Sequence, residues 1–179
     1  MIHKICKKNI FDFLGEQKII EKILVKNDIE IFETDNNAKL QKVTITNLNQ
    51  NSKYWTLNLE ANSFQPQGNK VEKVIFEQNE DILNIILVEL KSGNVSNESR
   101  VIKKFKNSLT WTYILLNLLN NEQHQNIKVF AILVAQEDKN WNKKETLNIL
   151  SSTKIKYTKR SFFTTENKID IDYQDLIKN

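Results

Sequence analysis

The most distinctive pattern along the chain lies between residues 82 and 91, where an apolar run ends in two opposite charges. Six of the first seven residues are apolar, which is typical of a strand covered on both faces. Glu89 and Lys91 follow, and side chains two positions apart in a strand lie on one face, roughly 6.6 Å apart. Charges at the end of a core strand are costly, so their presence indicates a site that needs both.

Periodicity predicts the elements that precede this strand. Apolar positions within residues 1–27 recur broadly at helical spacing and predict an N-terminal helical segment. Residues 42–46 and 54–60 alternate between apolar and polar, as strands with one buried face do. The Asn-Gln-Asn-Ser cluster at residues 49–52 predicts a hairpin turn between them.

The pattern after the charged pair predicts a helix and a second buried strand. Residues 99–119 carry apolar side chains near every 3.6 positions, and residues 127–135 are strongly apolar. The two buried strands and the helix between them form a plausible βαβ crossover. Residues 40–135 are therefore the expected sheet core, and residues 154–172 are expected to add C-terminal strands. The whole chain is interpreted as one α/β domain of 179 residues.

Composition excludes several classes of protein. The single cysteine, Cys6, rules out an internal disulfide framework and a cysteine-rich zinc site. His3 and His124 lie near no other candidate ligand, and no Gly-rich phosphate loop or Gly-x-Ser-x-Gly elbow is present. No apolar run reaches the length of a bilayer span and no secretion signal is recognisable, so we expect a cytoplasmic protein without a membrane partner. A net charge of +4 permits a polyanionic partner without requiring one.

The tripeptide Glu-x-Lys is not informative alone, because it occurs elsewhere in the chain. Its context at residues 89–93, Glu-Leu-Lys-Ser-Gly, is distinctive, because a strand that begins Val-Glu-Lys-Val-Ile-Phe at residues 71–76 precedes it. Glu72 lies 17 positions before Glu89. Together these segments resemble the PD-(D/E)xK nuclease superfamily, also called restriction-endonuclease-like. The resemblance implies a central mixed β-sheet flanked by helices.

The resemblance also implies a metal-dependent phosphodiesterase site. The carboxylates of Glu72 and Glu89, with the backbone carbonyl of Leu90, would hold Mg²⁺ or Mn²⁺, which prefer oxygen ligands. Lys91 would orient the attacking water or neutralise charge that develops on phosphorus. The alternative without a function for Glu89 and Lys91 is a solvated ion pair on an edge strand. The apolar run before these two residues disfavours an edge strand.

Other polar residues extend this candidate site. Family members often carry a glutamine on the following helix that faces the active site, and Lys104 falls at that position. Arg100, Lys103 and Lys104 are candidates for nucleic-acid binding, although a solvent-exposed helical face explains them equally well. Glu60 and Glu77 are candidate additional acids at this site.

We therefore expect an endonuclease in nucleic-acid processing or defence, with DNA as the favoured substrate and RNA as the alternative. Nucleases of this superfamily often act as dimers, so a homodimer or a place in a larger complex is expected. The chain departs from the family pattern in two ways, because the proline of the motif is absent and Glu72 stands where aspartate is usual. The alternative is a catalytically inactive nuclease-fold subunit that binds nucleic acid or assembles with proteins.

Overall fold

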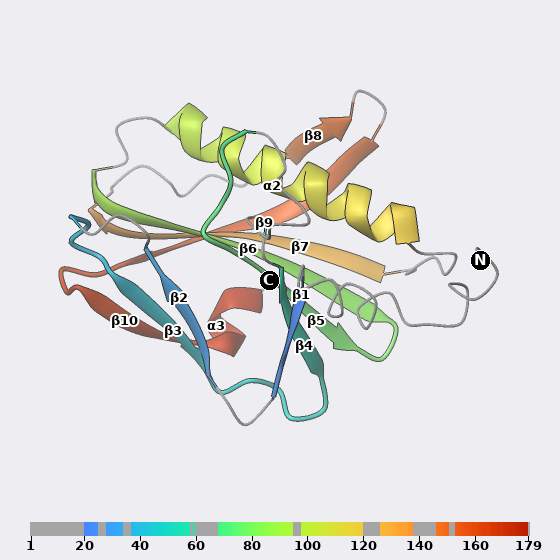
Figure 1. The fold of residues 1–179 in the computed structure, drawn as a ribbon, viewed down its shortest axis with the longest axis horizontal. Coiled ribbons are helices and arrows are strands. Elements are labelled where there is room, and N and C mark those ends of the chain that lie inside the picture. Colours follow the sequence, from blue (N-terminus) through green and yellow to red (C-terminus); the bar gives the residue numbers. More distant parts are fainter. Residues whose placement is uncertain are drawn as a thin grey trace.

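The structure is a computed structural model that describes nine stretches of the chain: residues 20–24, 28–33, 37–57, 59, 68–94, 98–119, 126–137, 146–150 and 153–178. Within these residues the chain forms a mixed α/β fold in three layers (Figure 1). The middle layer is a large mixed sheet, which confirms the predicted fold class at this level. A long helix covers one face, and a small sheet with a short helix covers the other (Figure 1).

The described residues form seven strands in the large sheet and three in the small one. In spatial order, the strands of the large sheet are β1 (Ile20–Ile23), β4 (Lys53–Leu57), β5 (Lys73–Asn79), β6 (Ile82–Asn94), β7 (Asn126–Glu137), β9 (Thr153–Phe163) and β8 (Thr146–Leu150). Those of the small sheet are β10 (Lys168–Asp172), β3 (Lys42–Thr46) and β2 (Ile29–Phe32). The helices are α2 (Glu98–Leu119) and α3 (Tyr173–Ile177).

The central strand β6 has the environment that its apolar run predicts. It pairs antiparallel with β5 and parallel with β7, and α2 makes the connection to β7, so the predicted βαβ crossover is confirmed. Leu83, Ile85 and Leu87 pack in the cluster under α2, whereas Ile86 and Val88 pack in the cluster on the opposite face. An almost unbroken apolar sequence is required because water reaches neither face of this strand.

Helix α2 packs on the large sheet through a stripe at helical spacing. Val101, Phe105, Leu109 and Leu116 are buried there, together with the fully buried Thr112. The hydroxyl of Thr112 donates to the carbonyl of Ser108 at 2.8 Å, so the polar group is satisfied within the helix. These contacts confirm the helix that the periodicity predicts.

Among the described residues, a long helix covers one face of the large sheet and only the short helix α3 lies on the other. The other face is covered mainly by the small sheet, which presents Ile31, Val43 and Ile45 to the core. Alternate residues of β2 and β3 are buried and the others are more exposed, as expected of a sheet with one solvated face. Helix α3 has only five residues and adds Tyr173 and Leu176 to this layer.

Two local predictions are wrong. Residues 20–23 form β1 and not the end of a helix, because they pair antiparallel with β4 and extend the sheet, which suits their isoleucines. Residues 49–52 do form a turn, in which the Ser52 N–H donates to the Asn49 carbonyl at 3.1 Å. However, β3 and β4 belong to different sheets, so the turn carries the chain from one layer to the next and closes no hairpin.

A buried carboxylate joins the layers on the side of the small sheet. Glu77 on β5 is only 2% exposed and accepts hydrogen bonds from the side chains of Ser52, Tyr54, Asn84 and Tyr173. These donors come from the turn before β4, from β4, from β6 and from α3. Burial, reinforced by the nearby charge of Glu77, raises the pKa of both tyrosines, so their hydroxyls stay protonated as donors. The network ties the C-terminal helix to the large sheet.

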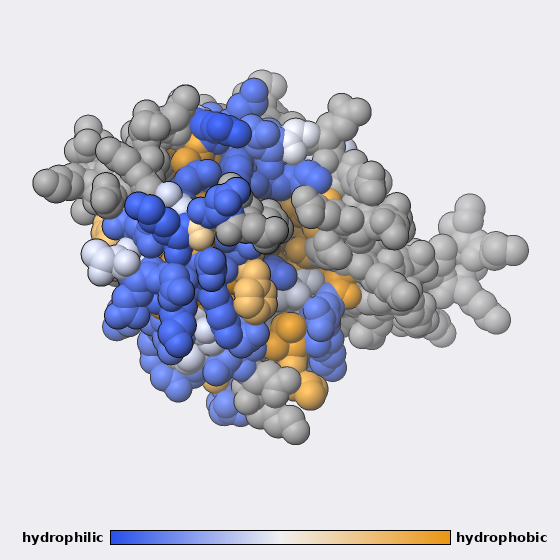
Figure 2. Space-filling view, turned by 60° about the vertical axis from the view of Figure 1, so that its left-hand side comes forward, coloured by the Kyte–Doolittle hydropathy of each residue, from blue (hydrophilic) through white to orange (hydrophobic). Residues whose placement is uncertain are grey.

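The outer surface is mainly polar where it is described. Figure 2 shows a face on which hydrophilic side chains predominate and apolar ones form small separate patches. Across the described residues, no helix combines the length and the apolarity that a bilayer crossing would require.

We expect the substitution Tyr173→Phe to lower the free energy of unfolding by about 1.5–3 kcal/mol, because it removes a hydrogen bond to a buried carboxylate. Urea denaturation measures this change. The matched control is Tyr113→Phe on the partly buried side of α2, which should change stability by less than about 0.5 kcal/mol. Equal stability of Tyr173→Phe and wild type would show that the network contributes nothing to holding α3.

Candidate functional site

The pairing of β5 with β6 brings Glu72 and Glu89 together. The ladder ends at the pair of Lys73 with Val88, so the next positions outward on the two strands are Glu72 and Glu89. Val74 and Leu87 are paired two positions inward from Glu72 and Glu89, and both pack in the cluster under α2. Because side chains alternate across a sheet, Glu72 and Glu89 emerge on this same face, beneath α2.

The ammonium of Lys104, on α2, lies between these two carboxylates. Its Nζ is 2.7 Å from Oε1 of Glu89 and 3.3 Å from Oε1 of Glu72. The Nζ of Lys91 lies 3.2 Å from the same Glu89 oxygen. We call Glu72, Glu89, Lys91 and Lys104 the charge cluster. It unites both predicted acids with the predicted lysine, and it gives Lys104 ionic contacts to both acids.

Burial within the charge cluster is graded from the sheet outward. The side chain of Glu89 is 0% exposed, those of Glu72 and Lys104 are 14% and 15% exposed, and that of Lys91 is 31% exposed. Neither carboxylate oxygen of Glu89 makes a hydrogen bond with a described residue. Oε1 is compensated by its two ionic contacts, whereas Oε2 is buried without a partner among the described residues, which is costly and uncommon for a carboxylate.

The electrostatics of the charge cluster are dominated by burial. Desolvation raises the pKa of Glu89, although Lys104 and then Lys91 lower it in part. Desolvation also raises the pKa of Glu72, which Lys104 opposes and the charges of Glu89 and Glu33 reinforce. Burial would lower the pKa of Lys104, but Glu89 and Glu72 together raise it, so the amine remains an ammonium ion. The site therefore holds cationic charge tightly and carboxylate charge at a cost.

The segment that carries Glu72 is held against α2 by polar contacts. The backbone N–H of Val71 donates to the fully buried hydroxyl of Ser108 at 2.9 Å. Nearby, Gly68 has a φ of +96°, and a Cβ there would lie 2.8 Å from the amide nitrogen of Asn107. The positive φ favours glycine at this position, whereas the amide end of the Asn107 side chain could move aside. These contacts fix the entry into β5 and thereby the position of Glu72.

The remaining predicted residues lie outside the charge cluster. Leu90, proposed as a ligand through its backbone carbonyl, packs its side chain on the opposite face of β6, so only its main chain lies beside Glu89 and Lys91. Glu77 belongs to the buried network on that face, so it does not take the place of Glu72. Arg100 and Lys103 are exposed on α2, with Arg100 one turn before Lys104. Glu60 lies outside the described residues.

The charge cluster offers two carboxylates to a cation. In the described part of the chain, no group of three or more His, Cys, Asp or Glu side chains is placed to hold a metal ion. Mg²⁺ is often held by one or two carboxylates, with water and substrate phosphates as its other ligands. The unpartnered Oε2 of Glu89 and the neighbouring Glu72 meet this smaller requirement. Glu72 and Glu89 are thus the two carboxylates of the charge cluster that could hold a divalent cation.

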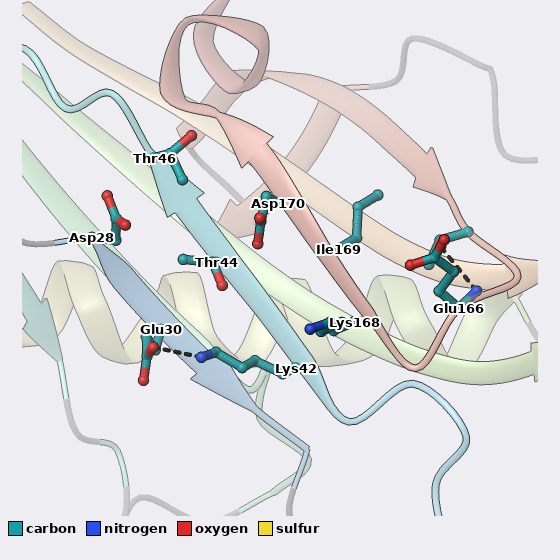
Figure 3. Close-up of a pocket in the computed structure, with 10 residues that line it drawn as sticks. Asp28, Glu30, Lys42, Thr44, Thr46, Glu166, Lys168, Ile169 and Asp170 are labelled. Carbon is teal, nitrogen blue, oxygen red and sulfur yellow. Dashed lines mark hydrogen bonds and ion pairs between the residues drawn. The ribbon is translucent and has the colours of Figure 1, made fainter.

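A hollow of about 500 Å³ lies elsewhere, on the solvated face of the small sheet (Figure 3). Glu30 and Lys42 form an ion pair of 2.5 Å there, and the alternate residues Thr44 and Thr46 also line it. The inward residues of the same strands pack in the core cluster opposite α2. The hollow is therefore separated from the charge cluster by the small sheet and the large sheet.

The sequence pattern identified the members of the charge cluster but not the contacts of Lys104. Its neighbour Lys103 is exposed, and the two lysines look alike in the sequence. The available signal was the helical phase, because Lys104 immediately precedes the buried Phe105 and lies one turn before Ser108. Comparison of the chain with protein-family models, with curated proteins and with solved structures gave no match.

The raised pKa of Glu89 predicts a pH-dependent stability difference between wild type and Glu89→Gln. The unfolded carboxyl releases its proton near pH 4.5, whereas the folded one retains it to higher pH. Across that interval the folded state binds more protons, so wild-type stability falls relative to the variant as pH rises, by at most about 1.4 kcal/mol per pH unit. Denaturation of both proteins at several pH values measures this, and a difference that is constant with pH would contradict it.

Proposed function

We propose that this chain is a divalent-metal-dependent phosphodiesterase that cleaves nucleic acid, DNA rather than RNA, and that its fold is restriction-endonuclease-like. The arrangement of the acids supports this proposal. Glu72 immediately precedes β5, and Glu89 and Lys91 lie just beyond the part of β6 that pairs with β5, where β6 still pairs with β7. The helix that follows presents Lys104 to them. This order along the chain is the one that the sequence resemblance implies.

The observation that carries the proposal is the convergence of two carboxylates at a buried position whose charge is incompletely compensated. Glu89 is fully buried and its Oε2 has no hydrogen-bond partner among the described residues. A carboxylate with a purely structural role normally has its oxygens satisfied, as the four donors around Glu77 illustrate. Glu89 therefore retains an acceptor that the described residues do not use, next to the oxygen that Lys104 contacts.

The chain's own residues would divide the work at this site. Glu72 and Glu89 would hold Mg²⁺ or Mn²⁺, which would polarise the phosphate and lower the pKa of a bound water. Lys91 is the most exposed member of the charge cluster, so its amine can reach a phosphate at the surface while staying near Glu89. There it would orient the attacking water or stabilise negative charge in the transition state. Arg100 and Lys103 would bind neighbouring phosphates.

One observation favours a second candidate, a nuclease-fold subunit that binds nucleic acid without cleaving it. The Lys104 ammonium already contacts both carboxylates, so an internal cation stands where a divalent ion would be needed. If that contact is permanent, the charge cluster is a structural ion-pair network. The two candidates differ in metal-dependent cleavage, which is directly measurable.

We expect the wild-type protein to cleave DNA with Mg²⁺ or Mn²⁺ and not with EDTA, and Lys91→Ala to lower the cleavage rate by about 10²–10³-fold. Linear, circular, branched and single-stranded substrates should be compared, with RNA in parallel. The control is Lys128→Ala, because Lys128 pairs with Asn84 near the opposite end of β6. Its cleavage rate should equal that of wild type.

Full cleavage by a folded Lys91→Ala protein would reject the role of Lys91. Absence of metal-dependent cleavage on every substrate, with salt-sensitive binding of nucleic acid, would favour the second candidate. If the protein neither cleaves nor binds any of these nucleic acids, both candidate functions are rejected.

We also expect Arg100→Gln and Lys103→Gln each to weaken binding to a DNA duplex and to reduce its salt dependence. Removal of one phosphate-binding cation should lower the slope of log K against log [salt] by about 1. Fluorescence anisotropy between about 50 and 200 mM salt measures the slope, with Lys128→Gln as the control. If the slope of log K against log [salt] is unchanged in both helix variants, this side of α2 does not contact the phosphate backbone of the DNA.

A further inference from the structure

We propose that the ammonium of Lys104 is a built-in counter-ion that a divalent cation must displace, and that the displaced amine then binds a phosphate of the nucleic acid. This inference rests on the proposed function and specifies how the site is regulated. Metal and nucleic acid would then bind cooperatively, because each favours the same outward position of one side chain.

The distances make simultaneous occupancy unfavourable. The Nζ of Lys104 lies 2.7 Å from the Glu89 carboxylate and 3.3 Å from the Glu72 carboxylate. A magnesium ion ligated by both would approach each oxygen to about 2.0–2.1 Å. It would therefore occupy the space between the same carboxylates, in close contact with a positive charge. Like charges at such a separation repel strongly where water is scarce.

The surroundings explain why a counter-ion is needed without metal. Glu89 is fully buried and Glu72 is partly buried, and two carboxylates in a shared site disfavour each other's ionisation. Within the charge cluster, Lys91 forms an ion pair with Glu89 alone, whereas Lys104 forms ion pairs with both acids. Lys104 is thus the cation that holds the acids together in the resting protein.

Lys104 is also able to leave this position. Its ammonium is carried on a flexible four-carbon stem, so the amine can move while α2 stays packed on the sheet. Its side chain is 15% exposed, in contrast to the closed position of Glu89, so a route to solvent exists. Arg100 lies one helical turn away and is exposed. A phosphate bound near Arg100 would stabilise the displaced amine.

The first test measures Mn²⁺ binding to the protein alone, by electron paramagnetic resonance and calorimetry. Lys104→Gln removes the competing charge and should raise Mn²⁺ affinity about 5–150-fold over wild type. Lys106→Gln, two positions away on α2 and exposed, is the matched control and should match the wild-type affinity. The double variant Lys104→Gln with Glu89→Gln should lose the gain, because a proposed ligand is gone.

The second test concerns coupling. A DNA duplex with non-hydrolysable phosphorothioate linkages should raise the Mn²⁺ affinity of the wild type and leave that of Lys104→Gln nearly unchanged. By reciprocity, Mn²⁺ should raise the DNA affinity of the wild type by the same factor. Equal coupling in both proteins would overturn the displacement of Lys104.

The outcomes separate this inference from the proposed function. Metal-dependent cleavage by the wild type, with no gain of Mn²⁺ affinity in Lys104→Gln, overturns the inference and leaves the function standing. No Mn²⁺ binding in either protein, together with no cleavage, overturns both. If Lys104→Gln does not fold, NMR of the wild type labelled with ¹³C-lysine replaces it. Mg²⁺ should then move the Lys104 ε-carbon signal to that of a solvent-exposed lysine, and an unmoved signal overturns the inference.

Discussion

The buried carboxylate of Glu89 is the constraint on which the site depends. A charge inside a sheet between two core layers is costly unless a cation compensates it. The compensation comes from Lys104 at 2.7 Å and Lys91 at 3.2 Å. The position of α2 over the end of β6 therefore has an electrostatic as well as an apolar reason. Because Glu72 contacts the same ammonium, the two ionic contacts of Lys104 connect β6, the segment before β5 and α2.

The large sheet carries a buried carboxylate on each face, and the two are compensated in different ways. Glu77 is surrounded by neutral donors from four parts of the chain, and this arrangement locks layers together. Glu89 is compensated by ammonium groups on flexible stems and retains an oxygen without a hydrogen-bond partner among the described residues. A closed network is difficult to rearrange, whereas ionic contacts through lysine stems can be exchanged for others. This contrast supports a structural role for Glu77 and a functional role for Glu89.

The two candidate functions place the same residues in the same positions and differ in whether Lys104 moves. A fixed ammonium makes the charge cluster a permanent ion-pair network in a binding module. If the Lys104 ammonium can leave, the charge cluster is a cation site that this ammonium occupies until a phosphate backbone binds nearby. This arrangement has a physical advantage, because acids without a counter-ion would destabilise the metal-free protein through their mutual repulsion.

The sequence by itself determined the centre of the molecule. The apolar run before Glu89 identified β6, and the 3.6-residue periodicity identified α2. The sequence resemblance implied that Glu72 and Glu89 come together, and the pairing of β5 with β6 brings them to neighbouring positions. Only the tertiary structure decided which layer each remaining segment joins. Residues 20–23 form a strand because they pair with the edge of β4. Residues 49–52 connect two different sheets. Likewise, Lys103 and Lys104 are two adjacent lysines in the sequence, and only the packing of α2 on the sheet directs Lys104 toward the two carboxylates. Local periodicity records which face of an element is buried, whereas the partner that buries it is set by contacts between distant parts of the chain.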